Sequence, residues 1–177
     1  MRIIAGSLKG REFKSPHGHR THPMSEKVRG ALFNMLGDID GLTFLDAFAG
    51  SGALAFEAVS RGAAFFRAID SDKSAHRTLA ENIKQLNLTD KIKATRANSS
   101  GWSDNNPDEL FDIVFLAPPY DELQENLLYK LSRHVKSGGL LVLDWPGKLE
   151  PLAFKSFDTV ADKSYGDAQL VFYRKIQ

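Results

Sequence analysis

The chain has 177 residues and a mass of 19.6 kDa, with 42% hydrophobic and 25% charged residues, which fits one folded domain and excludes a disordered, collagen-like or coiled-coil protein. It contains no cysteine, so disulfides, thiolate zinc sites and cysteine nucleophiles are excluded. No apolar run approaches the roughly 18 residues that cross a bilayer, and the start, MRIIAGSLKGREF, does not read as a signal peptide, so we expect a cytoplasmic protein.

Positive charge gathers near the N-terminus. The chain has 23 basic and 22 acidic side chains, but residues 1–34 hold seven basic and two acidic ones, which gives this segment a charge of +5 and the rest −4. A basic arm on an acidic body favours a nucleic acid as partner. The alternative is a solvated N-terminus without a partner.

The first 41 residues predict one hairpin and one helix. Residues 2–5 and 11–14 indicate a short basic hairpin, and residues 15–23 form a linker rich in Pro, Gly and His. Ser25 can cap a helix whose apolar positions recur every three or four residues, and Gly37 ends it.

Beyond residue 41, apolar strands alternate with helical stretches. The expected strands are residues 42–47, 64–69, 92–97, 111–116 and 139–144, and the expected helices are residues 53–60, 74–86 and 123–135. Residues 98–109 read as a polar surface loop, and two last strands, 153–163 and 169–175, are joined around Tyr165-Gly166-Asp167. The fold class is therefore α/β, a mostly parallel seven-stranded sheet with a closing antiparallel hairpin, in which ligands bind beyond the carboxyl ends of the strands.

A glycine turn follows the first of these strands. Asp46 precedes it, and Gly50 and Gly52 allow a close backbone approach to a ligand. A carboxylate here would repel a pyrophosphate, whereas it would attract the ammonium group of S-adenosylmethionine, which has no phosphate. The alternative for Asp46 is a simple cap of the following helix.

Polar residues also follow the next two strands. Asp70 is placed to take the two ribose hydroxyls of the cofactor, and Asn98 to bond the adenine edge, although Asp70 alone could equally be a turn former. The sequence predicts a binding site for S-adenosylmethionine built from Asp46, Phe48, Ala49, Gly50, Ser51, Gly52, Asp70, Ser71, Asn98 and Ser99.

A rigid turn ends the fourth expected strand, and we assign the chemistry to its residues Ala117, Pro118, Pro119 and Tyr120. An exocyclic amine of a nucleobase is a poor nucleophile, so hydrogen-bond acceptors must orient it toward the methyl donor. An aromatic ring at this edge, such as that of Tyr120, can stack on a base that has left its helix.

The sequence resembles the RsmD-type ribosomal RNA methyltransferases over nearly its whole length. The resemblance rests on the segments at residues 2–6, 9–11, 23–29, 31–34, 45–54, 57–58 and 60–63, on the Pro-Pro-Tyr turn and on Tyr165-Gly166-Asp167. It implies a Rossmann-like class I methyltransferase domain over residues 23–177, preceded by a basic hairpin or arm for RNA over residues 1–22.

The resemblance also implies methyl transfer from S-adenosylmethionine to the exocyclic N2 of a guanine in small-subunit (16S) rRNA. The partner is then ribosomal RNA or the small ribosomal subunit. The basic residues expected to contact the RNA are Arg2, Lys9, Arg11, Arg20, His22, Lys27 and Arg29.

Two positions depart from the family pattern. Ala117 stands where the family usually has Asp or Asn, which removes a side-chain acceptor for the amine, although the Pro118 carbonyl remains and Asp121 lies nearby in sequence. His22 stands where Arg is common, which weakens a phosphate contact.

Three other functions remain open. They are an RNA-binding protein that keeps the fold with weak or no transferase activity, a methyltransferase of another planar amine such as DNA adenine or a protein amide, and a nicotinamide-dependent oxidoreductase. The sequence indicates no metal site, and we expect a monomer.

Overall fold

The structure is a computed structural model that describes residues 1–17 and 23–177. Its centre is a seven-stranded sheet with the strand order β3-β2-β1-β4-β5-β7-β6. The first five strands pair in parallel, whereas β7 pairs antiparallel with β5 on one side and with β6 on the other. The strands are β1 (Thr43–Asp46), β2 (Phe65–Asp70), β3 (Ile92–Arg96), β4 (Phe111–Leu116), β5 (Val135–Pro146), β6 (Phe157–Tyr165) and β7 (Ala168–Lys175).

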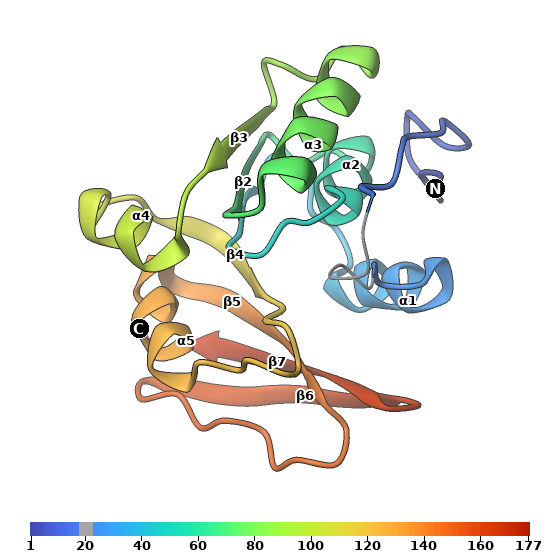
Figure 1. Ribbon diagram of the computed structural model, residues 1–177. Coiled ribbons are helices and arrows are strands. Elements are labelled where there is room, and N and C mark those ends of the chain that lie inside the picture. Colours follow the sequence, from blue (N-terminus) through green and yellow to red (C-terminus); the bar gives the residue numbers. More distant parts are fainter. Residues whose placement is uncertain (18–22) are drawn as a thin grey trace.

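Helices cover both faces of this sheet (Figure 1). They are α1 (Glu26–Leu36), α2 (Ala53–Ser60), α3 (Lys73–Gln85), α4 (Ser99–Asn105) and α5 (Glu125–Leu131), followed by the 3-10 turn Ser132–His134. Because side chains alternate along a strand, central strands such as β1 and β4 supply two cores. One core joins the sheet to α1, α2 and α3, and the other joins it to α4 and α5.

Three phenylalanines show how the first core is built. Phe44 of β1 lies between Phe66 of β2 and Phe115 of β4, with ring centroids 5.6 Å and 5.8 Å away. All three are buried, and the next residue of β1, Leu45, belongs to the core on the other face. The fold expected from the sequence, a mostly parallel sheet closed by an antiparallel hairpin, is thereby confirmed.

The strand order fixes where a ligand binds. The chain builds β1, β2 and β3 outward in one direction and then returns to place β4 on the other side of β1. In such a sheet the crevice lies beyond the carboxyl ends of the two strands where the winding reverses. Here these ends are Asp46 of β1 and Leu116 of β4, which the glycine turn and the Pro-Pro-Tyr turn follow.

Several element boundaries differ from the sequence-based expectation. The prediction of a loop over residues 98–109 was wrong, because Asn98 caps the short helix α4 and Trp102 buries its ring against His134. The helix expected over 123–135 is shorter, and β5 begins at Val135 instead of residue 139. The strand expected at 153–163 is β6 and begins only at Phe157.

The N-terminal hairpin is reduced to a single antiparallel bridge between Arg2 and Glu12. Ile3 and Phe13 are nevertheless buried in the core that contains α2, and the Phe13 ring centroid lies 4.8 Å from that of Phe56. The segment 1–17 is thus attached to the sheet domain by apolar packing.

Among the described residues, no helix has the length and apolar character needed to cross a membrane.

Candidate active site

The glycine turn after β1 has the backbone geometry that requires glycine. Gly50 and Gly52 have φ angles of 51° and 80°, in the left-handed region that other residues rarely adopt. The Ala49 amide donates to the Ile69 carbonyl at 2.9 Å, which fixes the turn to the end of β2. A Cβ atom on Gly52 would lie 2.3 Å from Cδ1 of Leu79, so α3 also packs closely against the turn.

Asp46 is a buried carboxylate with an unfilled acceptor. Its side chain is 3% exposed, and the Phe48 amide donates to Oδ1 at 2.9 Å. Burial raises the pKa of Asp46 to about 7, with the nearby Asp70 adding to the rise and the Phe48 hydrogen bond opposing it. No donor within residues 1–17 and 23–177 reaches Oδ2. A cationic ligand group beside Asp46 would compensate its buried charge.

Asp70 connects the glycine turn to α3. Its Oδ2 accepts from the Gly50 amide at 2.7 Å, and its Oδ1 accepts from the Asp72 amide at 2.8 Å. Asp72 in turn caps α3 by accepting from the Ala75 amide. Each Asp70 oxygen keeps lone-pair capacity, so the carboxylate can also accept from the hydroxyls of a ribose.

Asn98 and Ser99 connect the end of β3 to the same region. The Asn98 side-chain oxygen accepts from the Ser100 and Gly101 amides, at 2.9 Å and 3.3 Å, so it caps α4. Among residues 1–17 and 23–177, no acceptor meets its amide nitrogen, which can therefore bond to a ligand. Ser99 is buried and donates to the Ala47 carbonyl at 2.6 Å, which fixes α4 against the glycine turn.

The other residues expected at the cofactor lie in or beside the turn. Ala49 and Ser51 are buried, Phe48 is half-buried, and Ser71 is exposed. The carboxylates at the ends of β1 and β2 thus lie around one glycine turn. Their acceptor oxygens fit an ammonium group and the hydroxyls of a ribose.

A small hollow lies beside the Pro-Pro-Tyr turn. Its lining includes Met24 of the segment before α1, Leu54 of α2, Phe115 of β4, Ala117 and Asp144 of β5. The hollow is apolar apart from Asp144. Ala117 thus borders this hollow, and its methyl group offers no polar atom to it.

Tyr120 is held against β5, beside Asp144 of the hollow. Its hydroxyl donates to Asp144 and also lies 3.1 Å from the Trp145 carbonyl. Burial of the hydroxyl raises the pKa of Tyr120, and the negative charge of Asp144 adds to the rise, so the phenol stays protonated. The residue remains 42% exposed, which leaves ring surface for stacking.

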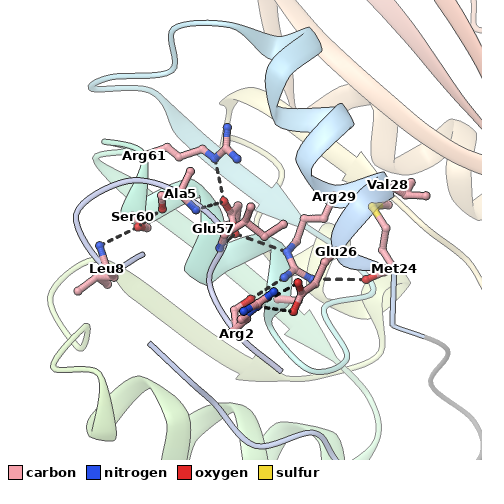
Figure 2. Close-up of polar contacts among 12 residues, drawn as sticks. Arg2, Ala5, Leu8, Met24, Glu26, Val28, Arg29, Glu57, Ser60 and Arg61 are labelled. Carbon is pink, nitrogen blue, oxygen red and sulfur yellow. Dashed lines mark hydrogen bonds and ion pairs between the residues drawn. The ribbon is translucent and has the colours of Figure 1, made fainter. Parts of the chain in front are cut away.

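A buried ion pair fastens α1 and the N-terminal segment to α2 (Figure 2). The Nε atom of Arg29 lies 3.5 Å from Oε2 of Glu57, and both side chains are 0% exposed. Arg29 also donates to the carbonyls of Arg2 and Met24, at 2.7 Å and 3.4 Å. Burial lowers the pKa of Arg29, and the attraction of Glu57 partly offsets that effect.

Glu57 also receives the backbone of the N-terminal segment. Its carboxylate accepts from the Ile4 and Ala5 amides, at 2.9 Å and 3.1 Å, and from Arg61 at 2.8 Å. One turn further along α2, the Ser60 hydroxyl donates to the Ala5 carbonyl. These contacts, drawn in Figure 2, place the N-terminal segment in a fixed position beside α2.

Arg29 requires a correction. The expectation that it contacts RNA does not fit its burial, because its guanidinium is enclosed by Glu57 and two backbone carbonyls. Lys9, Arg11 and Lys27 are exposed, and Arg2 is exposed while pairing with Glu26 at 3.1 Å. Arg20 and His22 lie outside the described residues.

Comparison with known proteins identifies the family. A family model described as "Conserved hypothetical protein 95" matches residues 1–174. A Bacillus subtilis protein, YlbH, provisionally named as an rRNA methyltransferase, is 34% identical over 182 residues that cover 99% of each chain. The Escherichia coli K12 protein named ribosomal RNA small subunit methyltransferase D is 35% identical over 122 residues, which cover 68% of this chain and 60% of that protein. The chain belongs to the RsmD-type family of rRNA methyltransferases.

Solved structures share the fold of this chain over nearly its whole length. The Escherichia coli protein yhhF is 27% identical with a TM-score of 0.86, and the alignment covers 99% of this chain and 98% of that one. A hypothetical protein of Thermus thermophilus is 32% identical with a TM-score of 0.79, and the alignment covers 97% and 98%. The protein is therefore a methyltransferase.

Two site residues of this RsmD-type enzyme escaped the sequence analysis. Asp144 follows the apolar residues 140–143 within β5, and an acid after an apolar run is the same signal that singled out Asp46 and Asp70. Glu57 is the one acid in the buried run Ala53–Ser60, and a charge in such a run indicates a buried partner. Among the described residues, no group of three or more acidic or histidine side chains is placed to hold a metal ion.

Proposed function

We propose that the protein transfers a methyl group from S-adenosylmethionine to the exocyclic N2 of a guanine in small-subunit rRNA. The observation that carries the proposal is the position of two features at one switch point of the sheet. The buried Asp46 and its glycine turn end β1, and the Pro-Pro-Tyr turn ends the neighbouring β4.

The residues of this chain have separate tasks in the proposed reaction. Bound S-adenosylmethionine supplies a methyl group on a sulfonium, which is open to in-line attack by an amine. Asp46 holds the ammonium group of the cofactor, and Asp70 holds its ribose. The exposed ring of Tyr120 receives the flipped guanine, and the Pro118 carbonyl accepts one N–H of its amine.

RNA binding is assigned to the N-terminal segment. Arg2, Lys9, Arg11 and Lys27 are exposed and lie in the basic part of the chain. Since Arg29 and Glu57 fasten this segment to α2, it offers its charges from a fixed position. The division into an arm over 1–22 and a domain over 23–177, action as a monomer and a location in the cytoplasm belong to this proposal.

The direct test is methyl transfer from labelled S-adenosylmethionine to small ribosomal subunits that lack the modification. Nucleosides from the product are separated and identified by mass, and we expect the label in N2-methylguanosine. Label in a methylated adenine would instead show that the protein methylates adenine and would contradict the proposed substrate.

One observation favours a second function, an RNA-binding protein with little transferase activity. Ala117 lacks the polar side chain that would orient an amine. This alternative predicts binding of S-adenosylhomocysteine and RNA with no label above background on any substrate.

A further inference from the structure

Asp144 lies beside Ala117 at the carboxyl edge of the sheet. Strands β4 and β5 pair in parallel with Leu116 opposite Leu143, so the next residues along, Ala117 and Asp144, are neighbours across the two strands. Adjacent strands are about 4.8 Å apart. A carboxylate at 144 is therefore within side-chain reach of the space that residue 117 leaves open.

Both residues face the same side of the sheet. Leu116 and Leu143 belong to the core beneath α4 and α5, whereas the preceding pair, Phe115 and Val142, belongs to the core beneath α1, α2 and α3. Because side chains alternate along a strand, residues 117 and 144 return to the face of Phe115. The lining of the hollow agrees, since it includes Ala117 and Asp144.

The Asp144 carboxylate is oriented and only half satisfied. The Tyr120 hydroxyl donates to Oδ1, and no donor from the described residues reaches Oδ2. Burial raises the pKa of Asp144, while the Tyr120 hydrogen bond opposes the rise. Asp144 is half-buried, and its Oδ2 is not enclosed by the protein, so this oxygen is free to accept a hydrogen bond from a bound molecule.

We propose that Asp144 accepts an N–H of the target amine and takes the place of the acceptor that Ala117 cannot supply. This inference rests on the proposed function. A planar amine attacks through a lone pair that must leave conjugation, and an acceptor on its N–H directs that lone pair.

With Asp144 in this position, every bond, electron pair and proton of the methyl transfer is accounted for. A nitrogen–carbon bond forms, the carbon–sulfur bond breaks, and the electron pair of that bond stays on sulfur, which becomes a thioether. The methylated nitrogen is then positively charged. It releases one proton to the Asp144 carboxylate, which passes the proton to water.

Asp121 offers a contrast on the same turn. It is exposed and does not line the hollow, although it is nearer to Ala117 in sequence. Asp121→Ala is thus a matched control that removes a carboxylate from the turn without touching the proposed acceptor.

The test uses the full chain on unmodified small subunits. We expect Asp144→Ala to lower kcat about 10²–10³-fold, the usual effect of losing one oriented group that stabilises a transition state. The Kd for S-adenosylhomocysteine should stay within about twofold, and Asp121→Ala should match the wild type. Adding Ala117→Asp to Asp144→Ala should recover at least about tenfold in kcat, because it returns a carboxylate to the same space.

The outcomes separate the two claims. If the wild type makes no N2-methylguanosine, the proposed function fails and this inference fails with it. If the wild type is active, a kcat of Asp144→Ala close to the wild-type value overturns the inference alone, as does a loss that Ala117→Asp leaves in place. Should the alanine variant not fold, Asp144→Asn decides on the same criteria. Its amide oxygen stays with Tyr120 and its NH2 group then meets the amine, so it should also be slow.

Discussion

At the scale of single residues, Asp46 links ligand binding to pH. Its pKa of about 7 in the free protein means that near neutral pH the carboxyl is partly protonated. A cationic ligand binds the ionised form and lowers this pKa. We therefore expect the affinity for S-adenosylhomocysteine to rise with pH up to about 7 and then level off, with proton release on binding near neutrality. Calorimetry in buffers of different ionisation enthalpy measures both effects.

The control for this prediction is Asp46→Asn, which should bind more weakly and without the pH dependence. The same substitution should raise the Tm at pH 8. A group whose pKa is higher in the folded than in the unfolded state destabilises the fold as pH rises from about 4 to about 7, and asparagine removes that cost. An affinity of the wild type that does not change between pH 5.5 and 8 would contradict the assigned role.

The buried pair of Arg29 and Glu57 makes a prediction about stability. Glu57→Gln leaves the arginine charge buried without a counter-ion, so we expect a loss of about 3–5 kcal/mol in the free energy of unfolding. Arg2→Ala breaks an exposed pair with Glu26 and should cost less than about 1 kcal/mol. Denaturant unfolding of the two variants provides the comparison. Similar losses of unfolding free energy in both variants would show that the buried pair stabilises the fold no more than the exposed pair does.

At the scale of elements, α4 depends on its cap. We expect Asn98→Ala to cost about 1 kcal/mol, because the Ser100 and Gly101 amides lose their acceptor, whereas Asn98→Asp keeps the cap. Urea unfolding gives the stability, and the Kd for S-adenosylhomocysteine reports on the adenine contact. If the amide nitrogen of Asn98 holds adenine, Asn98→Asp weakens binding at unchanged stability. If both variants and the wild type bind S-adenosylhomocysteine with equal affinity, Asn98 only caps α4 and does not contact adenine.

The same elements show what the sequence could and could not predict. Strands such as β1 and β4 are apolar on both faces, so their pattern alone identified a parallel sheet with helices on each side. Helix α4 was missed because Ser, Asn, Gly and Asp favour turns, and the burial of Trp102 that helps to stabilise it depends on tertiary packing.

Some site residues could likewise be predicted from the sequence, and others could not. Asp46 and Asp70 were predictable, because each ends an apolar strand that leads into a turn or a helix. The burial of Arg29 was not, since its partner Glu57 lies on another helix and an arginine in a basic segment resembles a solvated charge. The pairing of Ala117 with Asp144 likewise needed the register of β4 against β5, which sequence pattern does not determine.

At the scale of the whole molecule, charge is concentrated on the segment that leads into α1. We expect Arg2→Ala, Lys9→Ala and Arg11→Ala combined to weaken RNA binding and to reduce the slope of log affinity against log salt by about three units, one for each phosphate contact. The affinity for S-adenosylhomocysteine should be unchanged. Filter binding over a salt series measures the first effect and calorimetry the second.

The matched control removes three exposed lysines on α3 and at the β3 edge of the sheet, Lys84, Lys91 and Lys93. Their loss changes the net charge by the same amount and should leave the salt slope nearly intact. If both triple variants bind RNA equally weakly, general charge rather than the N-terminal segment directs the RNA.

The arrangement of the whole site is tested most directly by a crystal structure of the protein with S-adenosylhomocysteine. We predict the amino group of the ligand at hydrogen-bond distance from the Asp46 carboxylate, the ribose hydroxyls on Asp70, and the sulfur directed toward the space between Ala117 and Asp144. A ligand bound away from the glycine turn, or with its amino group held by another residue, would contradict the account.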